Sequence, residues 1–112
     1  MKQGANLSVV DQRRAARHAI NHSAIAEHRL LGDIKTHIVN ISDNGFMTEG
    51  DMPIGKGERI TVRLPILGQI EAHMIWTVGG RCGFQFERVI RLNEFLDMVE
   101  VLNPVTRVRL AR

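Results

Sequence analysis

Two groups of polar residues in this sequence have the types and spacing to bind a ligand. Arg13, Arg14 and Arg17 fall within five positions, and Asn40 and Ser42 lie two residues apart. A guanidinium can fork onto a phosphate or a guanine edge and can stack on a base. Residues two apart on a strand point to the same face, so Asn40 and Ser42 would share one surface. The structural alternatives are a solvated basic segment and ordinary turn capping.

The composition bounds the kind of protein that could carry such a site. A chain of 112 residues suits one compact domain with a real core. The net charge of +3 and the pI of about 9.8 suit an anionic ligand or a nucleic acid without requiring either. Cys82 is the only cysteine, so we expect a reduced, cytoplasmic chain. No apolar run reaches the length of a membrane span, and no membrane insertion is expected.

Six segments alternate between apolar and polar residues with the period of a strand, and turn residues separate them. The segments are 20–30, 35–42, 45–49, 59–64, 69–78 and 81–87. The pair Gly32-Asp33 predicts the first turn, and Asn44-Gly45 predicts the second through tolerance of a positive φ. In residues 69–78 the alternation places Trp76 on the inward face with Met74. Short strands at this spacing favour an antiparallel barrel or sandwich.

The hydrophobic period becomes helical near the end of the chain. The apolar positions are Leu92, Phe95, Leu96, Val99 and Leu102. Asn93 is the expected N-cap, and Asn103-Pro104 ends the helix. The expected organisation is a flexible arm over 1–17, an all-β barrel with a C-terminal helix over 18–102, and a tail over 103–112. The helix would cover an open end of the barrel.

The arginines form an RxxxR pattern from Arg13 to Arg17, and about two dozen residues later Asn40 to Gly45 match [DN]xSxxG. In this order and at this separation the two motifs resemble those of the PilZ domain family. The resemblance extends from about residue 13 to residue 101. It implies a six-stranded antiparallel β-barrel closed by one α-helix.

The resemblance also implies a function, that of a bacterial receptor for cyclic di-GMP with no further cofactor. In such a receptor the three arginines would close over the ligand and Asn40 would meet a guanine edge. Ser42 would bond a guanine or a phosphate, and Gly45 would serve the turn. The expected partners are cyclic di-GMP and an unidentified downstream protein, and the expected state is a monomer or weak dimer.

Other functional classes agree less well with the sequence. A small basic barrel that binds RNA or single-stranded DNA displays aromatic residues for base stacking, but most aromatic residues here fall at inward positions. A PilZ-like adaptor without a ligand typically has degraded motifs, and both motifs are intact in this chain. No G-x-S-x-G, P-loop or HExxH pattern is present, so no catalytic activity is expected. The histidines lack zinc spacing, so no metal is expected.

Overall fold

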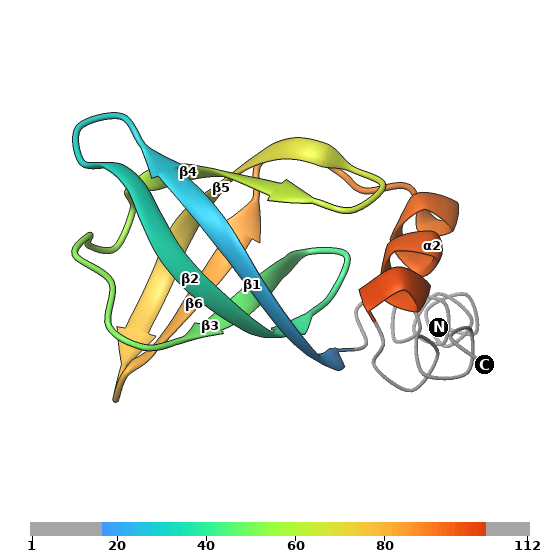
Figure 1. Ribbon diagram of the computed structural model, residues 1–112, viewed down its shortest axis with the longest axis horizontal. Coiled ribbons are helices and arrows are strands. Elements are labelled where there is room, and N and C mark those ends of the chain that lie inside the picture. The colour runs from blue at the N-terminus through green and yellow to red at the C-terminus, as the bar shows by residue number, and fades with distance from the viewer. Residues whose placement is uncertain (1–16, 103–112) are drawn as a thin grey trace, which may run out of the picture.

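The computed structural model describes residues 17–102, which form a closed six-stranded barrel with one helix at its end (Figure 1). The elements are β1 (His18–His28), β2 (Gly32–Ile41), β3 (Gly45–Glu49), β4 (Arg59–Leu64), β5 (Gly68–Val78), β6 (Arg81–Phe86) and α2 (Leu92–Leu102). The strand order is β1-β2-β3-β6-β5-β4, and every neighbouring pair is antiparallel. The predicted fold class is confirmed. Apart from Arg17, the predicted arm and tail lie outside the described residues.

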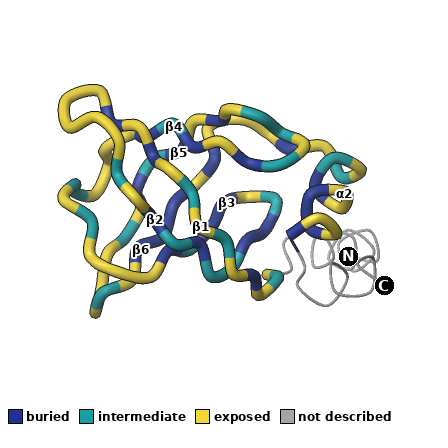
Figure 2. Tube along the Cα trace, viewed as in Figure 1, coloured by how far each residue is buried: buried dark blue, intermediate teal, exposed yellow. Residues whose placement is uncertain are grey.

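The core of the barrel is built from the inward-facing residues of its strands. In β4, Ile60 and Val62 are buried, whereas Arg59 and Arg63 on either side of this pair are exposed. This alternation recurs along the strands as dark and light segments of the chain trace (Figure 2). Burying a side chain of this size stabilises the fold by about 1.5–3 kcal/mol. The two-residue period read from the sequence therefore also determines which residues remain on the outer surface.

Helix α2 lies beyond one end of the barrel and covers it with its apolar face (Figure 1). The buried residues of the helix are Phe95, Met98, Val99 and Leu102. The Phe95 ring lies 5.5 Å from the His18 imidazole at the start of β1, measured between centroids. The N–H of Phe95 donates to the carbonyl of Arg91, 2.9 Å away. Asn93 therefore lies inside the first turn, and its predicted role as N-cap is wrong.

A bulge in β5 changes which way the end of that strand faces. Met74 pairs with Phe84, whereas Trp76 pairs with Gly83, and the register shifts between the two pairs. A bulge adds one residue to one strand, so the side chains beyond it exchange faces. Trp76 therefore shares the outer face with Gly83 and is only half-buried. The prediction that Trp76 lies on the inward face with Met74 is wrong for this reason.

The first hairpin turn lies slightly earlier than the sequence indicates. The turn occupies residues 29–31, and Gly32 is already the first residue of β2. The backbone of Gly32 has φ 75°, a conformation that side-chain-bearing residues rarely adopt. The glycine is therefore needed to leave the turn and enter the strand rather than to form the turn itself.

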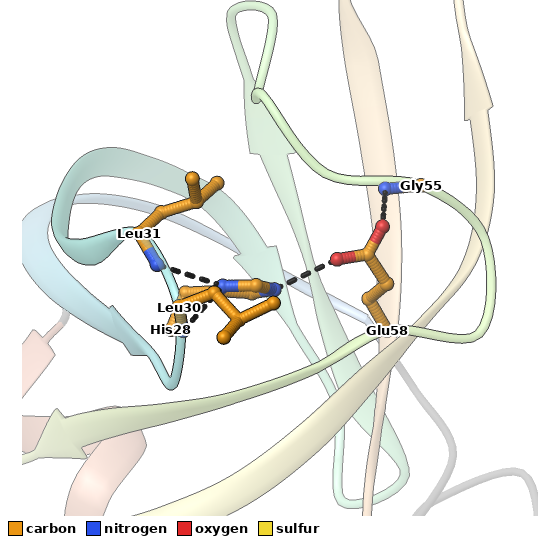
Figure 3. Close-up of polar contacts among 5 residues, drawn as sticks. All are labelled: His28, Leu30, Leu31, Gly55 and Glu58. Carbon is orange, nitrogen blue, oxygen red and sulfur yellow. Dashed lines mark hydrogen bonds and ion pairs between the residues drawn. The ribbon is translucent and has the colours of Figure 1, made fainter.

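At the end of the barrel away from the helix, a histidine joins two connections (Figure 3). His28 Nδ1 accepts the N–H groups of Leu30 and Leu31, each 3.2 Å away. The ring proton is therefore assigned to Nε2, which donates to Glu58 Oε1 at 2.7 Å. The other oxygen of Glu58 accepts the Gly55 N–H at 2.8 Å. The bond from Gly55, followed by the bond from His28, lowers the pKa of the Glu58 carboxyl. We call this arrangement the His28–Glu58 clasp.

Candidate ligand-binding site

A hollow of about 480 Å³ lies on the outside of the barrel, next to the turn between β2 and β3. Residues from the start of the described chain, this turn and strands β3, β5 and β6 line it. The lining includes Arg17, Ser42, Gly45, Trp76, Gly83 and Gln85. We call it the motif hollow, because members of both sequence motifs border it.

The structure brings four of the six predicted site residues together. Arg17, Ser42 and Gly45 line the motif hollow itself. Asn40 is connected to it through Arg17, whose Nη1 donates to Asn40 Oδ1 at 3.2 Å. The remaining two predicted residues, Arg13 and Arg14, lie outside the described residues. The last arginine of one motif and the first residue of the other are therefore direct neighbours in space.

Ser42 organises the turn that borders the hollow. The side chain is buried, and its Oγ accepts the Asn44 N–H at 3.2 Å. The Ser42 N–H donates to the Gly45 carbonyl at 2.8 Å, and the Phe86 N–H donates to the Asn44 carbonyl at 2.8 Å. The second of these bonds attaches the turn to β6. Because a hydroxyl that accepts one bond can still donate its own hydrogen, turn capping and ligand binding are compatible at Ser42.

Gly45 is required by the approach of two strands rather than by the turn angle. The residue is the first of β3 and pairs with Gln85 of β6. Neither Asn44 nor Gly45 is among the described residues with a positive φ, so the predicted reason for this Asn-Gly pair is wrong. A Cβ atom at Gly45 would instead overlap the carbonyl oxygen of Phe84. The missing side chain thus lets β3 and β6 pair closely beside the hollow.

Trp76 is a site residue that sequence analysis missed. Its indole covers Gly83, where an added Cβ would overlap the ring. The phenyl rings of Phe46 and Phe84 stack on each other with centroids 5.0 Å apart and are buried, so they serve the core. A half-buried indole at the hollow offers a surface on which a base could stack. The available signal was Gly83 itself, since a glycine in mid-strand often marks a close approach.

The electrostatics of the motif hollow favour an anion. Among the residues that the structure describes, Arg17 is the only charged one in its lining. Asn40, beside Arg17, is a neutral amide, so no carboxylate cancels the guanidinium charge at this contact. A cation in a hollow whose described lining carries no carboxylate raises the local concentration of anions. Within residues 17–102, no group of His, Cys, Asp or Glu side chains could hold a metal ion.

The barrel, its covering helix and the motif hollow together define a small β-barrel domain that could bind an anionic ligand. The family model of the PilZ domain matches residues 11–101. The chain therefore belongs to the PilZ domain family, whose members are in general receptors for cyclic di-GMP, and the resemblance read from the two motifs is confirmed. No curated protein matches this sequence. In the part of the chain described, no helix is long and apolar enough to cross a membrane.

Proposed function

We propose that this protein is a bacterial receptor that binds cyclic di-GMP at the motif hollow and then engages a protein target. The observation that carries the proposal is the hydrogen bond between Arg17 and Asn40, which joins the two motifs across 23 positions of sequence. Cyclic di-GMP has two phosphates and two guanines. A guanidinium and an amide held side by side offer complementary groups to a phosphate and to an adjacent guanine edge.

In this proposal the Arg17–Asn40 hydrogen bond is replaced by stronger hydrogen bonds between each of the two residues and the ligand. Arg17 turns its guanidinium to a phosphate or to the O6/N7 edge of a guanine. Asn40 Oδ1 then accepts from N1–H or N2–H of a guanine. The bond to be broken is between exposed groups, so breaking it costs little. In the free protein Arg17 and Asn40 are therefore already adjacent, and only a weak hydrogen bond joins them.

Further residues complete the proposed site. Ser42 donates its hydroxyl hydrogen to a guanine or a phosphate while its oxygen keeps capping the turn. Trp76 stacks on a guanine, because its indole lies at the hollow and is only half-buried. Arg13 and Arg14 bring two more guanidinium groups to the phosphates. Gly45 contributes by having no side chain.

The burial of the aromatic residues argues against a general nucleic-acid platform on the described surface. The phenylalanines Phe46, Phe84, Phe86 and Phe95 are all buried. Binding of single-stranded RNA or DNA usually uses several exposed rings, on which successive bases stack. In the part of the chain described, Trp76 is the only aromatic residue that borders the hollow without being buried. One ring suits a single base better than a strand.

The proposal is tested by calorimetric titration of the full chain with cyclic di-GMP, GMP, GTP and cyclic di-AMP at one salt concentration. We expect saturable binding of cyclic di-GMP and weaker binding of the other three. A folded protein that gives no heat with cyclic di-GMP would refute the proposal and favour a PilZ-domain adaptor. Binding of any single-stranded oligonucleotide, with an affinity that falls steeply with salt, would instead favour the nucleic-acid alternative.

A further inference from the structure

We infer that Gln85 is an additional ligand-contacting residue, which pairs with the edge of a purine base held in the motif hollow. This inference rests on the proposed function and extends it to a residue outside both sequence motifs. Gln85 lies on β6, is exposed and lines the hollow. Exposed strand residues are common, so the inference depends on the residues that surround Gln85.

The neighbours of Gln85 on the adjacent strands leave its carboxamide without a partner. On β3 it faces Gly45, which has no side chain, and on β5 it faces His73. His73 Nδ1 is hydrogen-bonded to Glu87 Oε2 at 2.8 Å. Arg59 Nε lies 3.5 Å from the same oxygen. His73 and Arg59 therefore both pair with Glu87.

The neighbours of Gln85 along the chain also leave its carboxamide unpaired. Two residues before Gln85 lies Gly83, which is covered by the indole of Trp76. Two residues after it lies Glu87, which already accepts from His73. Within residues 17–102 the carboxamide of Gln85 makes no hydrogen bond. The strand thus presents one donor and one acceptor at the hollow, about 7 Å along β6 from the position that the indole covers.

A carboxamide at this position matches a purine edge. It presents a donor and an acceptor side by side, so it can pair with O6 and N1–H of guanine. Rotated by half a turn, the same group can pair with the N6 amino group and N1 of adenine. A carboxylate only accepts, so it can pair with N1–H and N2–H of guanine but would meet the bare N1 acceptor of adenine. The amides of Asn40 and Gln85 therefore predict a site that tolerates one adenine better than a site with carboxylates would.

The first test compares Gln85→Ala with a matched control, Gln69→Ala. Gln69 is also an exposed strand glutamine, but it lines a different groove. In titrations with cyclic di-GMP we expect Gln85→Ala to bind about tenfold more weakly, as for the loss of one base-edge contact, and Gln69→Ala to bind like the parent. Melting temperatures should match the parent protein in both variants. If Gln85→Ala binds like the parent, the inference is overturned while the proposed function stands; if the parent protein does not bind cyclic di-GMP, both are overturned.

The second test examines base discrimination with Gln85→Glu. The two probes are cyclic di-GMP and the mixed cyclic dinucleotide with one guanine and one adenine. We expect the parent protein to bind the mixed ligand somewhat more weakly than cyclic di-GMP. In Gln85→Glu the ratio of the two dissociation constants should widen by about tenfold, because a carboxylate can accept from the N6 amino group of adenine but repels its N1 acceptor. An unchanged ratio in a folded variant would overturn the base-edge role of Gln85.

Discussion

The outer surface of this barrel carries two hollows that differ in size and in charge. The larger, about 870 Å³, is bordered by β1, β2, β4 and the segment after β3, while the motif hollow measures about 480 Å³. Charged residues of both signs line the larger one, namely Glu27, Lys35, Glu49, Asp51 and Arg63. Opposite charges at close range weaken the field that an anion would experience. The lining of the smaller hollow is therefore the more favourable of the two for an anion, although its volume is the smaller.

The two hollows also differ in how their polar groups are used. At the larger one, the sulfur of Met52 lies 3.8 Å from the Thr36 hydroxyl and 3.7 Å from the Thr48 hydroxyl, both of which are buried. These groups satisfy one another and hold the segment after β3 against the barrel. At the motif hollow, the carboxamide of Gln85 makes no hydrogen bond within residues 17–102, and Arg17 donates to Asn40 between exposed groups. The buried polar groups beside the larger hollow therefore stabilise the fold, whereas Arg17 and Gln85 at the motif hollow keep hydrogen-bonding capacity for a ligand.

The strongest test of this contrast removes one arginine from each hollow. Arg17→Ala should weaken cyclic di-GMP binding about a hundredfold or more, since a guanidinium on a phosphate makes charge-assisted bonds worth about 1.5–3 kcal/mol each. Arg63→Ala, an exposed arginine at the larger hollow, should bind like the parent protein. Neither change should lower the melting temperature appreciably, because exposed arginines contribute little to folding. Equal loss of affinity in both variants would mean that the ligand site is misplaced.

The next largest effect is a loss of folding stability, which should differ between substitutions at two glycines. Gly45→Ala should lower the free energy of unfolding by about 2 kcal/mol, because the added Cβ overlaps the Phe84 carbonyl and β3 must move away from β6. Gly55→Ala is the control, since its Cβ would meet only Glu58 Oε2 at 3.4 Å. Urea denaturation of both variants measures the difference. A Gly45→Ala protein as stable as the parent would show that the strands tolerate separation here.

A smaller effect is expected at Asn40. Asn40→Ala should cost about 1–2 kcal/mol of binding free energy, the range for one lost hydrogen-bond partner. Asn40→Asp should hold or raise the affinity, because a carboxylate accepts from N1–H and N2–H together, and charge-assisted bonds are stronger. Titration of the three proteins with cyclic di-GMP, with folding checked by circular dichroism, measures the ranking. If Asn40→Asp loses as much affinity as Asn40→Ala, Asn40 does not meet a guanine edge.

The smallest effect is a pH dependence at the opposite end of the barrel. The lowered pKa of Glu58 means that its carboxylate stabilises the folded state above the ordinary value of 4.5, and that this contribution is lost as the pH falls through the lowered pKa. The melting temperature of the parent protein should therefore fall more steeply below about pH 4.5 than that of Glu58→Gln. Ligand affinity should be the same in both proteins at neutral pH, since the clasp is remote from the motif hollow. Identical acid profiles would show that the clasp adds nothing to stability.

Much of the fold could be predicted because strand periodicity and burial are local properties. The alternation in β4 correctly placed Ile60 and Val62 inside the barrel and Arg59 and Arg63 outside. Errors arose where pairing between strands changes the local pattern. The bulge before Trp76 depends on how β5 aligns with β6, and no periodicity within β5 reveals it. The start of α2 was misplaced by a smaller amount, because its first hydrogen bond uses Arg91 rather than a polar cap.

The residues of the candidate site were also predicted only in part. The two motifs predicted Arg17, Asn40, Ser42 and Gly45, and the structure places these residues together, although their ligand contacts remain predictions. Trp76 and Gln85 carry no motif, so only their position beside the hollow draws attention to them. A residue such as Gln85 is one of many exposed polar residues in a sequence. It becomes a candidate only when its neighbours are known to be glycines or groups already paired.

The sequence by itself determined six strand segments and one amphipathic helix, and it placed two polar motifs that could bind an anionic ligand. These are consequences of residue type and short-range spacing. The tertiary structure alone decided that Trp76 faces outward, that Gly45 is needed for strand approach, and that the carboxamide of Gln85 has no partner within residues 17–102. Each of these facts depends on which residues of distant strands lie opposite one another, and that register is decided by the packing of the closed barrel.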